Sequence, residues 1–119
     1  MKIGVVGCNG RVGKLIVSEL QSGEWSRHGL ELSGGSARST DHIDSSFFIT
    51  DNEDVLFENS DVIIDFTLPE GTLHHAKLAA QYKKTLIIGT TGLSDSDEDV
   101  LRTAAKDTTI IYAANMSVG

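Results

Sequence analysis

The amino-acid sequence predicts an α/β fold in which a mostly parallel sheet carries helices on both faces. Two observations lead to this prediction. Short apolar runs typical of buried strands alternate with segments of helical periodicity along most of the chain. In addition, the first apolar run passes into a helical pattern through closely spaced glycines, as strand-to-helix turns in such folds do. Parallel strands of this kind are joined by right-handed crossovers.

The glycine-rich turn near the start of the chain is the strongest functional signal. A strand predicted over residues 2–6 ends at Gly7, and a helical pattern begins at about Arg11. Gly7, Gly10 and Gly13 have the spacing G-x-x-G-x-x-G, which lets backbone amides at a helix N-terminus approach a pyrophosphate closely. The turn therefore predicts a Rossmann-like dinucleotide site, in preference to a plain glycine-rich turn.

The elements that follow are predicted from hydrophobic periodicity and turn residues. The first helix has apolar residues at helical spacing, which we expect to be buried: Val12, Leu15, Ile16 and Leu20. Gly23 is expected to end this helix. A second strand is predicted over 29–35, a polar loop over 41–46, a short strand over 47–50 and a short helix around 55–57.

The second half of the chain contains the most apolar strands. Residues 61–66 predict a strand buried on both faces, because β-branched residues follow one another without alternation. Thr67 and Glu70 predict a capping box, with Pro69 in the first turn of the next helix. The inner face of that helix is predicted to consist of Leu73, Ala76, Ala79 and Ala80.

Two further strands complete the predicted sheet, over 85–88 and 109–113. Between them, Ser94 and Asp97 predict a capped helix whose inner face holds Val100, Leu101, Ala104 and Ala105. Ligands of such sheets bind at the carboxyl ends of the strands. We therefore expect the segments that follow these ends to surround one crevice: residues 7–11, 65–67, 89–91 and 113–116.

Composition limits the classes of partner. The 119 residues suffice for one hydrophobic core, and the formal net charge of −7 argues against nucleic acid or an anionic membrane surface as partner. No apolar run approaches the roughly 20 residues of a membrane span. Cys8 is the single cysteine, so no intrachain disulfide is expected and a cytoplasmic location is favoured. No cluster of residues has the spacing of a metal site.

Four motifs resemble those of the dihydrodipicolinate reductases, enzymes of lysine and diaminopimelate biosynthesis. The motifs are Val6-Gly7-x-x-Gly10-Arg11-x-Gly13, Asp65-Phe66-Thr67-x-Pro69-Glu70-Gly71-Thr72-Leu73, Ile88-Gly89-Thr90-Thr91-Gly92 and Ala114-Asn115-Met116-Ser117-Val118-Gly119. The resemblance runs over essentially the whole chain and concerns the N-terminal, cofactor-binding part of that family. It implies an NAD(P)H-dependent oxidoreductase that reduces 4-hydroxy-tetrahydrodipicolinate to tetrahydrodipicolinate.

The resemblance also implies which residues bind the cofactor. Those expected at the pyrophosphate are Gly7, Cys8, Asn9, Gly10, Arg11 and Val12. Those expected at the nicotinamide end are Gly89, Thr90, Thr91, Ala113, Ala114, Asn115 and Met116. The hydroxyl and backbone groups of the threonines suit the orientation of a carboxamide, and orientation is the protein's main contribution to hydride transfer.

The chain departs from the family at the end of the second strand. Where the family often has an acidic residue followed by arginine, this sequence has Ala37 and Arg38. A carboxylate at that position would bond the ribose hydroxyls of NAD, whereas an arginine would hold the 2′-phosphate of NADP. We therefore expect NADPH to bind at least as tightly as NADH. The alternative is that Arg38 is a solvated loop residue.

The family's paired-histidine signature and its Ser-Gly-Thr substrate loop are absent from this sequence. His74 and His75 are adjacent, but consecutive helical residues point about 100° apart and are not expected to serve one site. We expect both to be surface or groove residues. Residues 1–119 are thus predicted to form the dinucleotide-binding domain, truncated at its carboxyl end. The catalytic residues and substrate domain are expected beyond Gly119, so the chain should bind cofactor without turnover.

Several alternatives stay open at this point. Cys8 either fills a small position or is a reactive thiol near a helix N-terminus. Asp65 either bonds loop amides or faces the nicotinamide ribose. The chain is alternatively a stand-alone NAD(P)-binding or redox-sensing module, whereas a semialdehyde dehydrogenase needs a cysteine after the nucleotide domain. The full-length protein is expected to be a homo-oligomer, and an uncovered apolar sheet face would favour weak self-association.

Overall fold

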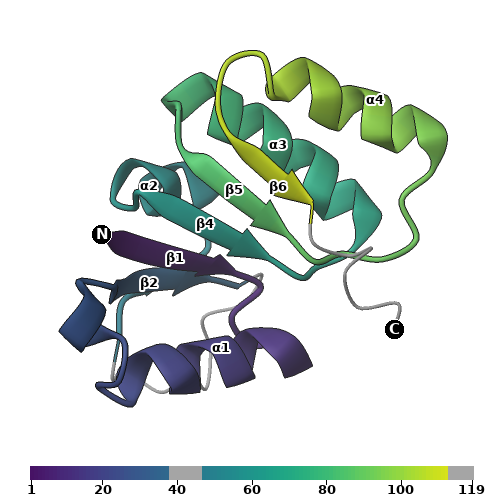
Figure 1. Cartoon of the computed structure of the whole chain (residues 1–119). Helices are drawn as coiled ribbons and strands as arrows, with labels where there is room; N and C mark the ends of the chain where they lie inside the picture. The colour runs from purple at the N-terminus through teal and green to yellow at the C-terminus, as the bar shows by residue number, and fades with distance from the viewer. Residues whose placement is uncertain (38–46, 113–119) are drawn as a thin grey trace.

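The computed structural model describes residues 1–37 and 47–112, and within them the strands form a single parallel sheet. Its six strands lie in the order β3-β2-β1-β4-β5-β6 (Figure 1). The strands are β1 (Lys2–Val6), β2 (Glu31–Ser36), β3 (Ile49–Thr50), β4 (Val62–Asp65), β5 (Thr85–Ile88) and β6 (Ile110–Tyr112). The helices are α1 (Arg11–Gln21), the 3-10 turn η1 (Ser26–His28), α2 (Glu53–Glu58), α3 (Pro69–Tyr82) and α4 (Asp95–Ala104).

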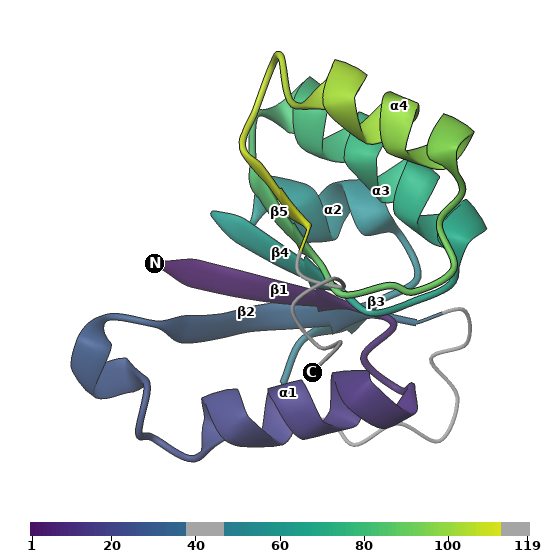
Figure 2. The ribbon, with the colours of Figure 1, turned by 45° about the vertical axis from the view of Figure 1, so that its right-hand side comes forward.

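The helices cover both faces of the sheet, as the sequence predicts. Helix α1 lies on one face, below β1 and β2, whereas α2, α3 and α4 lie on the other face (Figure 2). The chain runs outward from β1 to β3 on one side and from β4 to β6 on the other, so the strand order reverses between β1 and β4. Ligands of open α/β sheets bind at such a reversal, beyond the carboxyl ends of the strands.

The core has two parts, one on each face of the sheet. The larger part joins β4 and β5 to α2, α3 and α4 and contains the fully buried Leu56, Phe57 and Ile63. The smaller part, between β1 and α1, contains Val5, Cys8 and Val17. Cys8 lies against Gly35, where an added Cβ would come within 2.6 Å of the Cys8 Cβ. Cys8 therefore fills a small space in the core.

The buried face of α1 agrees with the predicted one only in part. Leu15 is 67% exposed and Val12 is also exposed, whereas Gly13 and Val17 are buried. The cause is Gly13, because a side chain there would overlap the carbonyl group of Gly7. Ile16 and Leu20 are half-buried and pack against the core, as predicted.

The two predicted capping boxes have opposite outcomes. At α4 the Ser94 and Asp97 side chains form the box, and Leu101 and Ala104 are buried as expected, although Ala105 is exposed. At α3 the prediction is wrong: Leu68 is the N-cap and supplies no side-chain bond. The Thr67 hydroxyl instead donates to the Asp65 carboxylate, which competes with the cap.

The sheet exposes apolar surface on the face that carries α1. Ile111 of β6 is 45% exposed, and its neighbours in register, Ile87 and then Ile64, are half-buried. Within the described part of the chain, no helix has the length and apolar character needed to cross a membrane.

Candidate functional site

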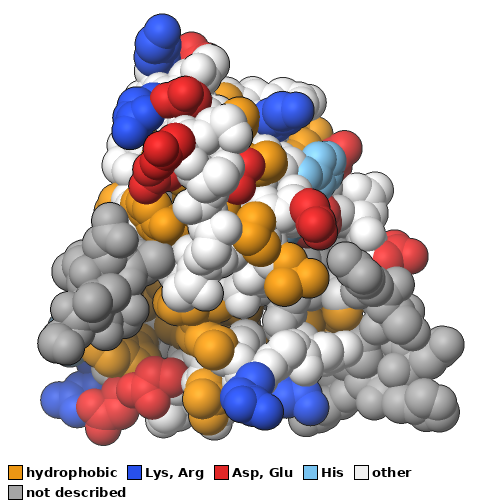
Figure 3. All heavy atoms as spheres, turned by 90° about the vertical axis from the view of Figure 1, so that its right-hand side faces the viewer, with side chains coloured by type: hydrophobic (Ala, Val, Ile, Leu, Met, Phe, Trp, Pro, Cys, Tyr) orange, Lys and Arg blue, Asp and Glu red, His pale blue; other side chains and the backbone are white. Residues whose placement is uncertain are grey.

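A cavity of about 660 Å³ lies at the carboxyl ends of β1, β2, β3 and β4, next to the reversal in strand order. Four segments line it: Gly7, Asn9 and Gly10; Ser36 and Ala37; Asp51 and Glu53; and Phe66, Thr67, Leu68, Gly71 and His75. Figure 3 views this edge of the sheet and shows exposed hydrophobic side chains near its middle. Phe66 and Leu68 are 42% and 61% exposed.

The turn from β1 to α1 has the geometry that its glycines predict. Gly7 adopts a φ of 65°, and its carbonyl accepts a hydrogen bond from Gly10 N at 2.9 Å. A Cβ on Gly7 would lie 2.7 Å from the Thr67 methyl group. Gly10 is the N-cap of α1 and provides no side-chain cap. Within the described residues no side chain caps the first amides of α1, which lie at the edge of the cavity, and this suits an anionic ligand.

The six residues expected at a pyrophosphate divide into three groups. Gly7, Asn9 and Gly10 line the cavity. Arg11 and Val12 are exposed in the first turn of α1 and are not part of the lining. The Cys8 side chain is 2% exposed and faces the core between β1 and α1, while its backbone N–H donates to Ser36 O at 2.9 Å.

The Cys8 thiol lacks the properties of a reactive cysteine. Burial raises its pKa, and this effect outweighs the opposing backbone hydrogen bond. A thiol that is buried and hard to ionise is a poor nucleophile. The structure therefore favours the space-filling alternative for this residue.

The second group of expected cofactor residues follows β5. Gly89 lies under the ring of Phe66, with which a side chain at position 89 would overlap. Thr90 is buried and its hydroxyl pairs with that of Thr72 at 2.8 Å, whereas Thr91 is exposed. None of residues 89–91 lines the described cavity, although Phe66 connects them to it. Arg38, Ala113, Ala114, Asn115 and Met116 lie outside the described residues.

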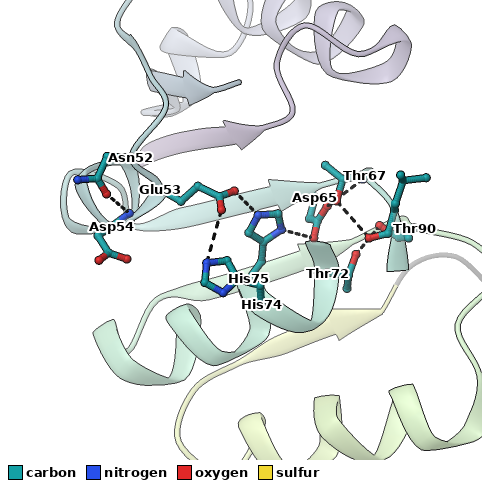
Figure 4. A network of polar contacts seen from close by, with 10 residues as sticks. Asn52, Glu53, Asp54, Asp65, Thr67, Thr72, His74, His75 and Thr90 are labelled. Atoms are coloured by element: carbon teal, nitrogen blue, oxygen red, sulfur yellow. Dashed lines mark hydrogen bonds and ion pairs between the residues drawn. The ribbon is translucent and has the colours of Figure 1, made fainter. Parts of the chain in front are cut away.

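A buried network that the sequence does not predict forms one wall of the cavity (Figure 4). His75 Nδ1 lies 2.8 Å from Asp65 Oδ2, and His75 Nε2 contacts a carboxylate oxygen of Glu53. The His75 side chain is 4% exposed and that of Asp65 is 0% exposed. The ring of Phe57 stacks on His75 with centroids 6.2 Å apart.

The adjacent histidines occupy different environments, but they share a partner. His74 is 59% exposed, as expected, and its Nε2 lies 3.6 Å from Glu53 Oε1. The two rings point to different surroundings, one exposed and one buried, although the long Glu53 side chain reaches both from α2. His75 lies in the cavity wall, but it is buried there.

The Asp65 side chain bonds the backbone of the loop that follows it. Its Oδ1 accepts hydrogen bonds from Thr67 N at 2.9 Å and from Thr67 Oγ1 at 2.6 Å. The alternative in which Asp65 bonds loop amides is therefore confirmed. A strand that ends in Asp two residues before Thr is the sequence signal for such a turn.

The network changes the pKa of all three ionisable groups. Burial alone would lower the pKa of His75, but hydrogen bonds and charges from Asp65 and Glu53 outweigh burial and raise it to about 9. Burial alone would raise the pKa of Asp65 and of Glu53, but the bonds and charge of His75 lower both. At neutral pH the wall therefore holds an imidazolium between two carboxylates.

The fold matches solved oxidoreductase structures. Homoserine dehydrogenase from S. aureus superposes with a TM-score of 0.77 at 16% identity, over 96% of this chain and 32% of that one. Dipicolinate-bound dihydrodipicolinate reductase from Paenisporosarcina sp. TG-14 superposes with a TM-score of 0.72 at 20% identity, over 88% of this chain and 43% of that one. At these identities the likeness establishes the fold alone.

Sequence comparison identifies the family. The 4-hydroxy-tetrahydrodipicolinate reductase of Neisseria meningitidis serogroup C is 37% identical, and that of Nitratiruptor sp. is 38% identical, each over the whole of this chain. The chain spans about half the length of these relatives, 47% and 46%. The family model described as "Dihydrodipicolinate reductase, N-terminus" matches residues 1–116. The chain therefore belongs to the dihydrodipicolinate reductase family and corresponds to its N-terminal part.

Proposed function

We propose that this chain binds NAD(P)H and forms the dinucleotide-binding part of a 4-hydroxy-tetrahydrodipicolinate reductase. The observation that carries the proposal is the glycine turn at the N-terminus of α1, which opens into a cavity at the reversal of strand order. The residues present fit the cofactor. Gly7 and Gly10 line the cavity without side chains of their own, and no side chain among the described residues caps the α1 amides.

In the proposed reaction the bound cofactor supplies a hydride, and the protein supplies orientation. Amides from Gly10 onward at the start of α1 would hold the pyrophosphate. Residues 89–91 and 113–116 would position the nicotinamide end. We place the residues that bind substrate and transfer protons beyond Gly119, because the family's paired-histidine signature is absent here. The chain would then bind cofactor without turnover.

We further propose that NADPH binds at least as tightly as NADH. Ala37 lines the cavity next to the end of β2 and has no carboxylate. It therefore neither bonds the ribose hydroxyls of NADH nor repels the 2′-phosphate of NADPH. Arg38, the residue that follows, would provide the cation for that phosphate. We also propose that the full-length protein is a homo-oligomer and that it is located in the cytoplasm. The single cysteine is free and buried, which agrees with a reducing compartment.

Calorimetric titration of the 119-residue chain with NADPH and with NADH tests the proposal. Both should bind saturably, and G10A should weaken both by about tenfold, because its methyl group would lie 3.3 Å from the Gly7 carbonyl oxygen and crowd the turn that would face the pyrophosphate. Ser18→Ala, on the exposed face of α1, is the matched control and should leave both affinities unchanged. No saturable binding at millimolar cofactor would contradict the proposal.

A further inference from the structure

The segment between β4 and α3 separates two glycine loops. This connecting segment, residues 65–68, places the Thr67 methyl group against Gly7, where a Cβ would lie 2.7 Å from it. On its other side the Phe66 ring covers Gly89. Each contact requires glycine on the opposite loop. The connecting segment therefore packs against both the Gly7 loop and the Gly89 loop.

Asp65 holds the connecting segment in place. Its carboxylate accepts two hydrogen bonds from Thr67, and its backbone carbonyl accepts a third from Gly89 N at 2.8 Å. Because Asp65 is fully buried, this carboxylate needs hydrogen-bond donors for each of its oxygens. Thr67 satisfies Oδ1, and His75 satisfies Oδ2.

His75 ties Asp65 to a different part of the cavity wall. Its Nδ1 faces Asp65 on β4, and its Nε2 faces Glu53 on α2. A neutral imidazole carries a single N–H and donates to one carboxylate, whereas the imidazolium donates to both. The protonated ring thus joins β4, α2 and α3 at one point.

We propose that His75 is a positioning residue of the dinucleotide site: through Asp65 it holds the connecting segment, and so sets the spacing of the Gly7 and Gly89 loops. The inference rests on the proposed function, because that spacing matters for a ligand that reaches both loops. His75 itself would not contact the ligand, because its ring is 4% exposed and its two nitrogens contact Glu53 and Asp65.

The proposal makes cofactor affinity depend on pH. The groups that face His75 are Asp65 from β4, Glu53 from α2 and His74 from its own helix, and Asp51 lines the same cavity. Loss of the His75 proton leaves two carboxylates without a shared donor, which loosens the connecting segment and adds negative charge beside an anionic ligand. Affinity should therefore fall as pH rises through about 9, the pKa of His75.

Two probes distinguish positioning from a general loss of stability. ADP-ribose carries the pyrophosphate without the nicotinamide and would reach the Gly7 loop alone, whereas NADPH would reach both loops. H75N should weaken the binding of NADPH by about tenfold and that of ADP-ribose by about threefold or less. A change in the spacing of the two loops affects NADPH more, because NADPH would contact both loops. His28→Asn is the matched control on an exposed histidine of η1 and should change neither affinity.

A second variant covers the case in which H75N fails to fold. Glu53→Gln keeps an acceptor for His75 Nε2 but removes one of the charges that raise the His75 pKa. The pH at which NADPH affinity falls should shift to a lower value in E53Q, together with the titration of the His75 ring proton followed by NMR. His28→Asn should keep the midpoint of the unaltered chain.

The outcomes separate the two proposals. If the unaltered chain binds neither probe at pH 7, the proposed function fails and this inference fails with it. If it binds both but the pH midpoint is the same in E53Q, His75 does not position the site. Equal weakening of NADPH and ADP-ribose in a folded H75N would likewise overturn the inference alone.

Discussion

The ring of Phe66 occupies the space in which a side chain on Gly89 would lie. The two residues come from neighbouring strands of the sheet: Phe66 follows β4, and Gly89 follows β5. The contact explains why the loop after β5 begins with glycine although its φ is not positive. The requirement at this position is space, and it originates in the neighbouring loop.

Gly89→Ala should therefore destabilise the fold by about 1–3 kcal/mol, the usual cost of overpacking. Urea unfolding measures the loss. Phe66→Ala removes the ring that causes the overlap, so the double variant should lose less than the sum of the two single losses. Additive losses would mean that the two residues do not share this space.

Replacement of His75 should cost far more than replacement of its neighbour. His75→Asn leaves the buried Asp65 without its charged partner, and breaking such a pair costs about 3–5 kcal/mol of unfolding free energy. His74→Asn is the matched control, because that ring is 59% exposed, and we expect a loss within about 0.5 kcal/mol. Similar losses for both variants would contradict the buried network.

The sheet was predictable because its strands are strong local patterns. Residues 62–64 of β4 and 86–88 of β5 are apolar without alternation, and the alternation of strands with helices favours parallel pairing. The orientation of α1 was not predictable from periodicity. It depends on how closely Gly13 approaches the Gly7 carbonyl, which is a contact between a helix and a turn.

The cavity was predictable in part for the same reason. The rule that ligands bind at the carboxyl ends of strands places Gly7, Asn9 and Gly10 at one crevice. The Glu53–His75–Asp65 network was not predictable, because its members come from three elements and no local spacing connects them. The burial of His75 was not predictable, because the sequence of two adjacent histidines on a helix does not show which ring faces inward.

The pH dependence of stability follows from the same network. The pKa of His75 is raised in the folded state from its usual 6.5 to about 9, so its stabilising contribution is complete below pH 6.5 and is lost as pH rises through 9. The pKa values of Asp65 and Glu53 are lowered, so their contributions are lost as pH falls below their usual values.

Unfolding free energy should therefore be greatest in mildly acidic solution and should fall by up to about 1.4 kcal/mol per pH unit between 6.5 and 9. Urea unfolding at a series of pH values measures this slope, and H75N should lack it. A slope of zero in the unaltered chain over this interval would show that His75 is not held as the cation.

Alkylation of Cys8 should be slow in the folded protein. The side chain is 2% exposed and its pKa is raised by burial, so iodoacetamide should react much faster once the chain is unfolded in urea. Mass spectrometry of timed samples with and without urea gives the two rates. Equal rates would indicate that the thiol is open to solvent in the folded state.

We expect the coenzyme preference to depend on the residue at the end of β2. Ala37→Glu should shift the preference toward NADH, because a carboxylate at this cavity-lining position accepts bonds from the ribose hydroxyls and repels a 2′-phosphate. We expect the ratio of NADPH to NADH affinity to fall by about tenfold, equivalent to about 1.4 kcal/mol. Ala37→Gln is nearly equal in size without the charge and should change the ratio much less, when both coenzymes are titrated at the same low salt concentration. If Ala37→Glu and Ala37→Gln change the ratio equally, charge at this position does not select the coenzyme, and the basis for a preference for NADPH is lost.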